Sequence, residues 1–585
     1  MKYEDFSFLI GGEAGAGIAR SGFLLAKACM RGGLHVFGTN DYQSLIRGGH
    51  NFYVARASER EIHSQTDSIN LLIALNAESV MLHKDELVQG GGIIYDSDDL
   101  ELTTEKLDKV DLKLYPIPLR KIVVDELKQP HSLIMRNTVA LGAAIAVTSY
   151  DLALLAGVMK DTFKPEAAEA NIKAAQIGYD YVKEHFEASF EYGLRKNATA
   201  GKQRVFLSGN EAIGLGALKA GCRFYVSYPM TPTTGLLHFM AENQRGFQMI
   251  AMQPEGEIAA INMTAGAAFA GARAMTGTSG GGFCLMSEGL GMAGMTETPI
   301  VVMVGQRPGP STGLPTYSAQ GDLRFVIHAS QGEFPRIVVA PGDLEECFYE
   351  TMRAFNWADR YQLPVILLTD KYVLESEASV EPFDEDLVKI ERGLLVDDRY
   401  DGVGEYRRYE VTETGVSPRA IPSAKDAIIH ANSDEHDEHG VVSEDPVVTT
   451  MMADKRMRKL QAVKREMEKR NVEVVKFYGS EEARATVISW GSTKGPIREA
   501  MKLLNSGLDV TNFLQILYLQ PFPRAKVEQA LEKAGKTIVV ENNSTSQLAS
   551  LIRDHTLRNV DRKILKYDGR PFNPVALSER IKEAL

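Results

Sequence analysis

Cysteine is scarce in this chain of 585 residues, and its four cysteines lie far apart in the sequence. They are Cys29, Cys222, Cys284 and Cys347, and no CxxC pair occurs. Iron–sulfur clusters are usually held by closely spaced cysteine thiolates, so this pattern argues against a cluster ligated by this chain alone. We expect four buried, reduced thiols.

Long apolar runs are also absent. The best candidate, residues 139–147, is much shorter than the roughly 20 residues that cross a bilayer, so it predicts a buried helix segment instead. The N-terminal sequence MKYEDF lacks the basic and then apolar regions of a signal peptide. We therefore expect a cytoplasmic protein without membrane contact.

Basic residues are outnumbered, with 65 lysines and arginines against 77 acidic residues and a formal net charge of -12. A nucleic-acid-binding protein needs a basic face, so the composition argues against a nucleic-acid partner. A small electron carrier could dock only on a local basic patch or on a different subunit.

The order of apolar strands, glycine turns and helices predicts three doubly wound α/β domains. In the first, residues 1–195, an apolar strand leads into the turn GGEAGAG and a helix at 18–31. A polar stretch at 194–204 indicates a linker. Residues 203–385 and 471–585 repeat the order of strand, glycine turn and helix.

An acidic loop and a charged helix, together residues 386–470, connect the second and third domains. We expect the helix at 452–470 to be solvated, with one apolar stripe of Met457, Leu460 and Met467 packed on the body. His436 and His439 stand among carboxylates in the loop, but their spacing does not match a metal site, so we predict no bound metal.

The sequence SYPMTPTT at 227–234 directly follows an apolar strand. Thr231 suits the N-cap of a helix and Pro232 its first position. Backbone amides at such a helix start, at the carboxyl end of a strand, can bind an anion. A purely structural cap is the alternative.

A second motif, QPEGE at 253–257, places Glu255 and Glu257 before a helix rich in alanine and glycine. A buried carboxylate there could exchange a proton with a heterocycle, whereas surface acids at a helix start are the alternative. The later sequence TGTSGGG predicts a glycine loop that would let the backbone approach a ligand, or else an ordinary turn.

The third motif, GQRPGPSTGLPT, follows the strand that begins at Pro299. Arg307 stands at the carboxyl end of this strand, at the edge where Thr231 is expected. Its guanidinium could bind a carboxylate bidentately, although many strand-end arginines are structural. The neighbouring proline and glycine residues would hold the loop rigid.

These three motifs, in this order and spacing, resemble the 2-oxoacid:ferredoxin oxidoreductase family. GGEAGAG and SLIRGGHN (44–51) resemble its gamma domain, residues 203–385 its pyrimidine-type thiamine diphosphate domain, and the C-terminal block its transketolase C-terminal-like domain. The resemblance covers nearly the whole chain and implies an alpha subunit of the fused gamma–alpha type.

The resemblance implies roles for individual residues. Thr231 and Arg307 would bind the 2-oxoacid, and Glu257 would activate thiamine diphosphate by bonding its aminopyrimidine ring. Because Glu255 is two residues away, the register could instead fall on it. The cofactor side of the site would also include Glu255, Pro229 and Gly281.

The family's GDG…N signature, which holds Mg²⁺ and the diphosphate, is missing here. The resemblance therefore implies a beta subunit, in a heterodimer or a dimer of heterodimers, that supplies the diphosphate site and the iron–sulfur cluster. Ferredoxin would take the electrons. Coenzyme A would approach the gamma domain, where Arg47, Arg120 and Lys121 are candidates to meet its phosphates.

The implied reaction is oxidative decarboxylation of a 2-oxoacid with coenzyme A, which can run in reverse as a carboxylation. We favour 2-oxoglutarate, giving succinyl-CoA and CO₂, because the fused form resembles that branch. Pyruvate or broad 2-oxoacid use is the alternative. A non-catalytic assembly subunit and a transketolase-like transferase are rivals from other classes.

Overall fold

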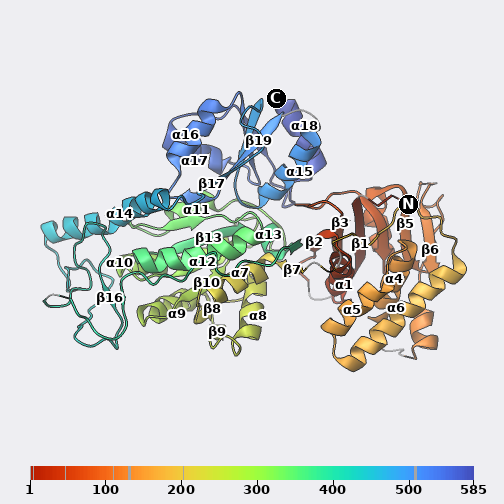
Figure 1. The fold of residues 1–585 in the computed structure, drawn as a ribbon, viewed down its shortest axis with the longest axis horizontal. Coiled ribbons are helices and arrows are strands. Elements are labelled where there is room, and N and C mark those ends of the chain that lie inside the picture. Colours follow the sequence, from red (N-terminus) through yellow and green to blue (C-terminus); the bar gives the residue numbers. More distant parts are fainter. Residues whose placement is uncertain are drawn as a thin grey trace. The chain divides into compact units, whose positions relative to one another are not determined.

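The computed structural model describes the chain except residues 1, 4, 46–47, 110, 129–133, 200, 202, 403 and 506–509. The described residues form an α/β architecture, as predicted, with sheets of eight, seven and five strands (Figure 1). Two compact units are present: residues 1–207 with 376–382 and 573–575, and the remainder. Among the described residues, no helix combines the length and apolar character needed to span a bilayer.

The first unit is built on the eight-stranded sheet, whose order is β6-β5-β4-β1-β3-β2-β14-β7. Strand β1 pairs in parallel with β4 and antiparallel with β3. The strands are β1 Asp5–Glu13, β2 His35–Asp41, β3 His50–Ser58, β4 Ile69–Ala74, β5 Leu87–Asp96, β6 Lys113–Ile117, β7 Val205–Ser208 and β14 Glu377–Val380.

Two of these strands differ from the expected organisation. The sequence placed the segments of β7 and β14 in the second block, but both join the first sheet. Strand β14 pairs antiparallel with β2, so the chain returns to the first unit after β13 and before β20 joins the second sheet. Pairing covers an edge strand whose backbone groups would otherwise lack partners.

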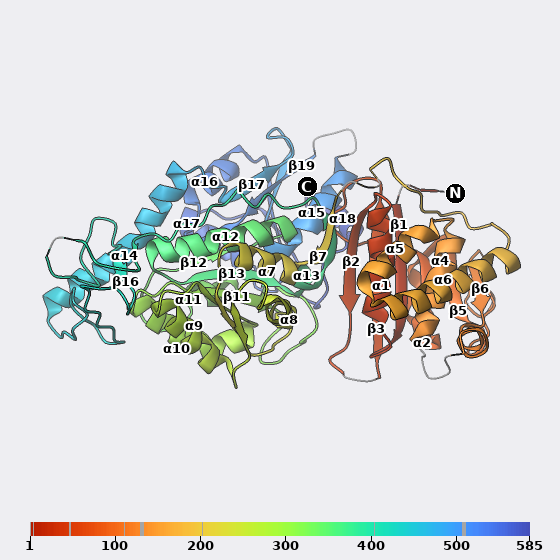
Figure 2. The same cartoon turned by 60° about the horizontal axis from the view of Figure 1, so that its bottom comes forward.

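Helices cover the first sheet on one face, where α1, α4, α5 and α6 share a continuous core (Figure 2). Helix α4 includes residues 139–147, all of them buried as predicted. A Cβ on Gly142 would lie 1.8 Å from the Ala175 carbonyl oxygen, so α4 and α6 meet backbone to backbone. The helices are α1 Ile18–Arg31, α2 Ala77–His83, α3 Leu119–Lys121, α4 Met135–Val147, α5 Leu152–Thr162 and α6 Pro165–His185.

The second unit contains the seven-stranded sheet, with the order β20-β12-β13-β11-β10-β8-β9. Strands β8 to β13 run parallel, so their carboxyl ends meet at one edge. The strands are β8 Phe224–Val226, β9 Ile250–Met252, β10 Ala274–Thr278, β11 Val301–Gln306, β12 Ile337–Val339, β13 Val365–Asp370 and β20 Tyr518–Gln520. The helices are α7 Gly209–Lys219, α8 Thr234–Asn243, α9 Glu257–Phe269, α10 Gly280–Met295, α11 Leu323–His328, α12 Leu344–Tyr361 and α13 Lys371–Glu375.

The five-stranded sheet follows in the same unit, with the order β17-β19-β18-β21-β22. Helices α15 and α18 pack on one face, and α16 and α17 share the core of the seven-stranded sheet. The strands are β17 Val475–Tyr478, β18 Ala485–Ser489, β19 Thr511–Ile516, β21 Thr537–Glu541 and β22 Arg562–Leu565; the helices are α15 Lys494–Leu504, α16 Arg524–Lys533, α17 Gln547–Thr556 and α18 Pro574–Ala584.

The connector contains β15 Leu395–Val396, β16 Arg419–Ala420 and the helix α14 Pro446–Lys469. Of the predicted apolar stripe of Met457, Leu460 and Met467, only Met467 is fully buried and Leu460 is half-buried. Met457 is 40% exposed, whereas Lys455 and Lys459 are fully buried. Both lysines bind the buried carboxylate of Glu297, with Lys455 Nζ at 2.7 and 2.8 Å from its two oxygens. A buried acid from the body thus recruits the charged face of the helix.

Candidate active site

The segment after β8 forms a tight turn before helix α8 begins. Thr233 donates to the Met230 carbonyl oxygen through both its backbone N–H and its hydroxyl, each at 2.8 Å. The Thr231–Pro232 peptide bond is cis. Helix α8 therefore begins at Thr234 with Thr233 in the N-cap position. The prediction of Thr231 as N-cap and Pro232 as first helical residue was wrong, because this turn occupies those positions.

Arg307 directly follows β11 and meets the same turn. Its Nη1 donates to the Thr231 carbonyl oxygen at 3.1 Å. Partial burial lowers the pKa of the Arg307 guanidinium, which nevertheless stays a cation because arginine ionises only at high pH. No carboxylate of the described residues lies within ion-pair distance of it. A half-buried cation without an acidic partner indicates an anionic ligand.

Glu257 is the first residue of α9 and is only 4% exposed. Its Oε1 is buried and has no hydrogen-bond partner among the described residues. Leaving a buried acceptor unpaired costs about 1–3 kcal/mol, so this oxygen is suited to a donor from a ligand. Glu255, by contrast, is exposed. Burial thus separates two acids that the sequence left as alternatives.

The predicted glycine loop is instead the first turn of helix α10, which begins at Gly280 after the N-cap Ser279. A Cβ on Gly282 would lie 2.0 Å from Thr278 Oγ1 and 2.6 Å from Glu257 Oε1, so glycine is required there. Gly281 is exposed, and a Cβ on it would meet only the Ser311 carbonyl oxygen, at 3.9 Å. A ligand could approach the backbone at this position.

The three motifs therefore meet at one edge of the seven-stranded sheet. Ser279 Oγ donates to Met230 Sδ at 2.6 Å, which joins the start of α10 to the turn that contains Pro229 and Thr231. Arg307 contacts that turn from the neighbouring strand end, and Glu257 contacts the first turn of α10. Asp322, which no motif in the sequence indicated, follows the loop of the third motif and lies against the start of α10.

The outward face of α9 and α10 carries almost no charge. Its exposed apolar residues are Ile258, Met263 and Leu285, and the edge strand β9 adds Ile250 and Met252. Cys284 is also exposed there, which corrects the expectation of four buried cysteines; the other three are buried. Several exposed apolar side chains beside a candidate site are typical of a protein interface.

The basic residues predicted to meet coenzyme A lie in the first unit. Arg120 forms an exposed ion pair with Asp99 at 3.2 Å. The side chain of Lys121 is exposed, while its backbone N–H donates to Asp98 at 2.8 Å. Arg47 lies outside the described residues. Their role in coenzyme A binding stays a prediction.

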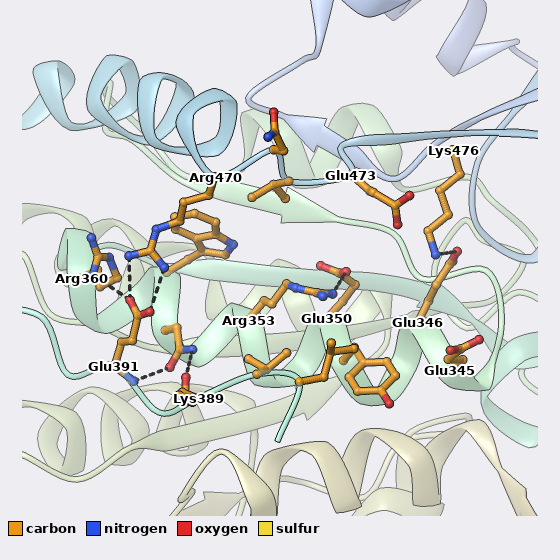
Figure 3. Close-up of a pocket in the computed structure, with 17 residues that line it drawn as sticks. Glu345, Glu346, Glu350, Arg353, Arg360, Lys389, Glu391, Arg470, Glu473 and Lys476 are labelled. Carbon is orange, nitrogen blue, oxygen red and sulfur yellow. Dashed lines mark hydrogen bonds and ion pairs between the residues drawn. The ribbon is translucent and has the colours of Figure 1, made fainter. Parts of the chain in front are cut away.

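A cavity of about 410 Å³ lies elsewhere in the second unit and shares no residue with this site. Several of its charged side chains pair with one another (Figure 3). Glu391 binds Arg360 at 2.7 Å and Arg470 at 2.8 Å, and Glu350 binds Arg353 at 2.6 Å. Of these pairs, the one between Arg360 and Glu391 joins α12 to the connector.

His436 in the connector is buried. Its Nδ1 lies 3.0 Å from the Asp434 carbonyl oxygen, and its ring packs against Tyr409. Glu435 pairs with Arg456 on α14. These contacts fix the acidic loop against the connector helix.

Nearly the whole chain is similar to known proteins. Residues 215–454 match the family described as pyruvate flavodoxin/ferredoxin oxidoreductase, thiamine diP-bdg, and residues 7–181 match pyruvate ferredoxin/flavodoxin oxidoreductase. The chain is 35% identical to the 2-oxoacid:ferredoxin oxidoreductase subunit alpha of a Sulfolobus species, over 99% of this chain and 96% of that protein. It is 34% identical to the 2-oxoglutarate synthase subunit KorA of Methanothermobacter thermautotrophicus, over 58% of this chain and 88% of that one.

The full length of the chain is also similar to a solved structure. It is the 2-oxoglutarate:ferredoxin oxidoreductase from Magnetococcus marinus, with 2-oxoglutarate, coenzyme A and succinyl-CoA bound. The TM-score is 0.90 and the sequence identity 33%, with 100% of both chains covered.

Proposed function

The chain belongs to the 2-oxoacid:ferredoxin oxidoreductase family as an alpha subunit, and on that premise we propose that it binds the 2-oxoacid and the pyrimidine end of thiamine diphosphate. One observation carries this proposal. At one edge of the same sheet stand Arg307, a cation with no acidic partner among the described residues, and Glu257, whose buried Oε1 receives no hydrogen bond from them.

Thiamine diphosphate fits the donor set around Glu257. The unpaired Oε1 needs a donor, and a protonated nitrogen of the aminopyrimidine ring supplies one. Glu257 would hold the ring and stabilise its proton, while Pro229, Glu255 and Gly281 would line the cofactor side. When bound, the thiamine group supplies the carbon nucleophile and electron sink that the reaction requires.

Arg307 and Thr231 suit a 2-oxoacid, which carries a carboxylate beside its ketone. The planar guanidinium would hold the carboxylate through two parallel hydrogen bonds. The Thr231 hydroxyl would donate to the adjacent oxygen of the substrate. The fixed contact between Arg307 and the Thr231 backbone keeps the two groups at a constant separation.

We favour 2-oxoglutarate as the substrate, with succinyl-CoA and CO₂ as products and electrons passed to ferredoxin. Two similar proteins support this choice by their names, the KorA subunit and the Magnetococcus marinus enzyme. Pyruvate or broad 2-oxoacid use is the alternative, because relatives with higher identity are named only for 2-oxoacids. The same site would serve the reverse carboxylation.

A beta subunit would complete the enzyme. The sequence lacks a GDG signature for Mg²⁺ and the diphosphate, and its four cysteines are dispersed. Among the described residues, no group of three or more histidine, cysteine or acidic side chains is placed to hold a metal. The exposed apolar residues of α9 and α10 would dock this subunit, which would bring the diphosphate site and the iron–sulfur cluster.

The first unit would bind coenzyme A. Lys121 offers an exposed cation for a phosphate, and Arg120 could exchange Asp99 for one. Arg47 belongs to the same prediction. Proteins in this family use coenzyme A as the acyl acceptor, so its phosphates need a basic surface somewhere on the complex.

The test is turnover by the chain purified with its beta subunit. Reduction of a low-potential viologen dye, with coenzyme A present, should depend on added 2-oxoacid and be fastest with 2-oxoglutarate. A higher kcat/KM for pyruvate would favour the alternative substrate. If no 2-oxoacid reduces the dye while the complex holds its cluster, the chain is an assembly subunit rather than a catalytic one.

A further inference from the structure

Asp322 stands at the N-cap position of helix α11 but does not cap it. Aspartate at this position normally accepts a hydrogen bond from the first turn of its helix. Here its carboxylate lies against the start of α10 instead, with Oδ2 only 2.3 Å from where a Cβ of Gly280 would be. No described residue donates a hydrogen bond to it, and burial raises its pKa to about 6.

The surrounding structure fixes the backbone of Asp322 in this place. Its N–H donates to Oε1 of the fully buried Gln306 at 2.9 Å, which joins the end of the loop to the residue before Arg307. On the preceding side, Gln320 Nε2 donates to the Trp490 carbonyl oxygen at 2.8 Å. The C-terminal domain therefore helps to position a carboxylate that it does not pair.

Asp322 belongs to the site described above. Glu257 contacts the first turn of α10 at Gly282, and Asp322 contacts the same turn at Gly280. Gly281, between them, is open to a ligand. Two carboxylates thus lie against one helix turn, and no described residue donates to Asp322 or to Oε1 of Glu257.

None of the described charged groups near Asp322 pairs with its carboxylate. Arg324, two residues later on α11, is engaged by Asp554 of α17. Other titratable or charged groups on the elements packed around it include Cys284 and Glu288 on α10, Glu257 on α9, His328 on α11, Arg307 after β11, Arg553 and His555 on α17, and Glu541 at the end of β21. Cys284 is an exposed thiol, and Glu541 accepts hydrogen bonds from Asn543 and Leu548. A carboxylate kept unpaired at such a site is typical of a proton-transfer group.

We propose that Asp322 accepts the proton of the substrate's former ketone oxygen as the acyl carbonyl re-forms. This rests on the proposed function. The O–H electron pair becomes the second bond of C=O, the proton moves to the Asp322 carboxylate, and the two electrons lost by the carbon go to ferredoxin. Asp322 then releases the proton to solvent, which matches the one proton freed when a 2-oxoacid anion and a thiol become a thioester and CO₂.

The test uses the complex with the beta subunit and the variant Asp322→Asn, which keeps the shape but cannot accept a proton. We expect kcat to fall about 10²-fold, the scale of a lost general base. The wild-type kcat should fall as the pH drops below about 6, because the protonated acid cannot act as acceptor. That dependence should vanish in Asp322→Asn, while KM for the 2-oxoacid and binding of thiamine diphosphate stay the same.

Asp554→Asn is the matched control, because it removes an acid from the same region without touching the site. It should keep the wild-type kcat and the wild-type pH profile. An Asp322→Asn enzyme that retains the acidic fall in kcat would overturn the assignment. Thermal unfolding of each variant distinguishes loss of fold from loss of chemistry. If the wild-type complex turns over no 2-oxoacid, the proposed function fails; if only Asp322→Asn behaves as wild type, this inference alone fails.

Discussion

Gly282→Ala should inactivate the enzyme by displacing Glu257. A Cβ at this position would lie 2.0 Å from Thr278 Oγ1, 2.6 Å from Glu257 Oε1 and 2.9 Å from Glu257 Cγ. Contacts between non-bonded heavy atoms are normally about 3.5–4.0 Å, so the three contacts must open by roughly 0.6 Å to 1.5 Å or more. Thr278 lies in the buried strand β10, whereas Glu257 is at a helix start, so the carboxylate is the group that moves.

Two effects of opposite sign determine how much Gly282→Ala changes the stability of the fold. Overpacking a tight site costs about 1–3 kcal/mol of stability. Alanine in a helix gains about 1 kcal/mol over glycine, which offsets part of that cost. The fold should therefore survive. Displacement of the Glu257 carboxylate from the aminopyrimidine ring should lower kcat about 10²-fold or more.

The assay is dye reduction by the complex, with thiamine diphosphate binding measured separately by fluorescence titration. Gly246→Ala is the control, because a Cβ there meets only a carbonyl oxygen, at 3.7 Å. It should leave kcat unchanged. Gly281→Ala tests whether the cofactor approaches the backbone at residue 281. It should weaken cofactor binding more than it lowers kcat.

The reasoning is wrong if Gly282→Ala matches Gly246→Ala in kcat and in cofactor affinity. In that case Glu257 either moves without consequence or is not the group that bonds the ring. A loss of stability without loss of turnover would lead to the same conclusion.

Four further predictions concern single side chains. Arg307→Lys keeps the charge but loses the planar fork, so 2-oxoacid binding should weaken by roughly 1.5–3 kcal/mol, seen in KM and inhibitor constants. Glu257→Gln should lower kcat about 10²-fold in an assembled complex, and Glu255→Gln should not; the reverse result would shift the register by two residues. Burial lowers the pKa of Lys459 from 10.5 to about 7 in the folded protein. Above pH 7 the unfolded chain therefore binds more protons than the folded chain, and the free energy of unfolding rises with pH. Wild type should then gain stability over Lys459→Met as the pH rises from 7 to 9 in urea unfolding, and a constant difference would contradict this. Lys121→Glu should raise KM for coenzyme A while the 2-oxoacid still reduces the cluster; equal loss in both half-reactions would point to a structural role.

Much of the local structure could be predicted because it is encoded locally. The helix expected at residues 18–31 begins and ends where α1 does, after the turn GGEAGAG. Buried parallel strands are continuous apolar runs, so β11 and β13 stand out in the sequence. A residue that follows such a strand must lie at the carboxyl edge of the sheet. This is why Arg307 and Thr231 could be expected together before their contact was known.

The sequence alone thus determined the α/β class, the chain's family resemblance and the edge of the sheet where the site lies. Tertiary structure decided which acid is buried, because Glu255 and Glu257 differ only in what packs on them. It also placed β14 in the first sheet and buried two lysines of α14 on Glu297, which precedes Lys455 by 158 residues. Asp322 became part of the site in the same way. Burial, pairing and desolvation depend on neighbours that are distant in the chain, and no local pattern carries that information.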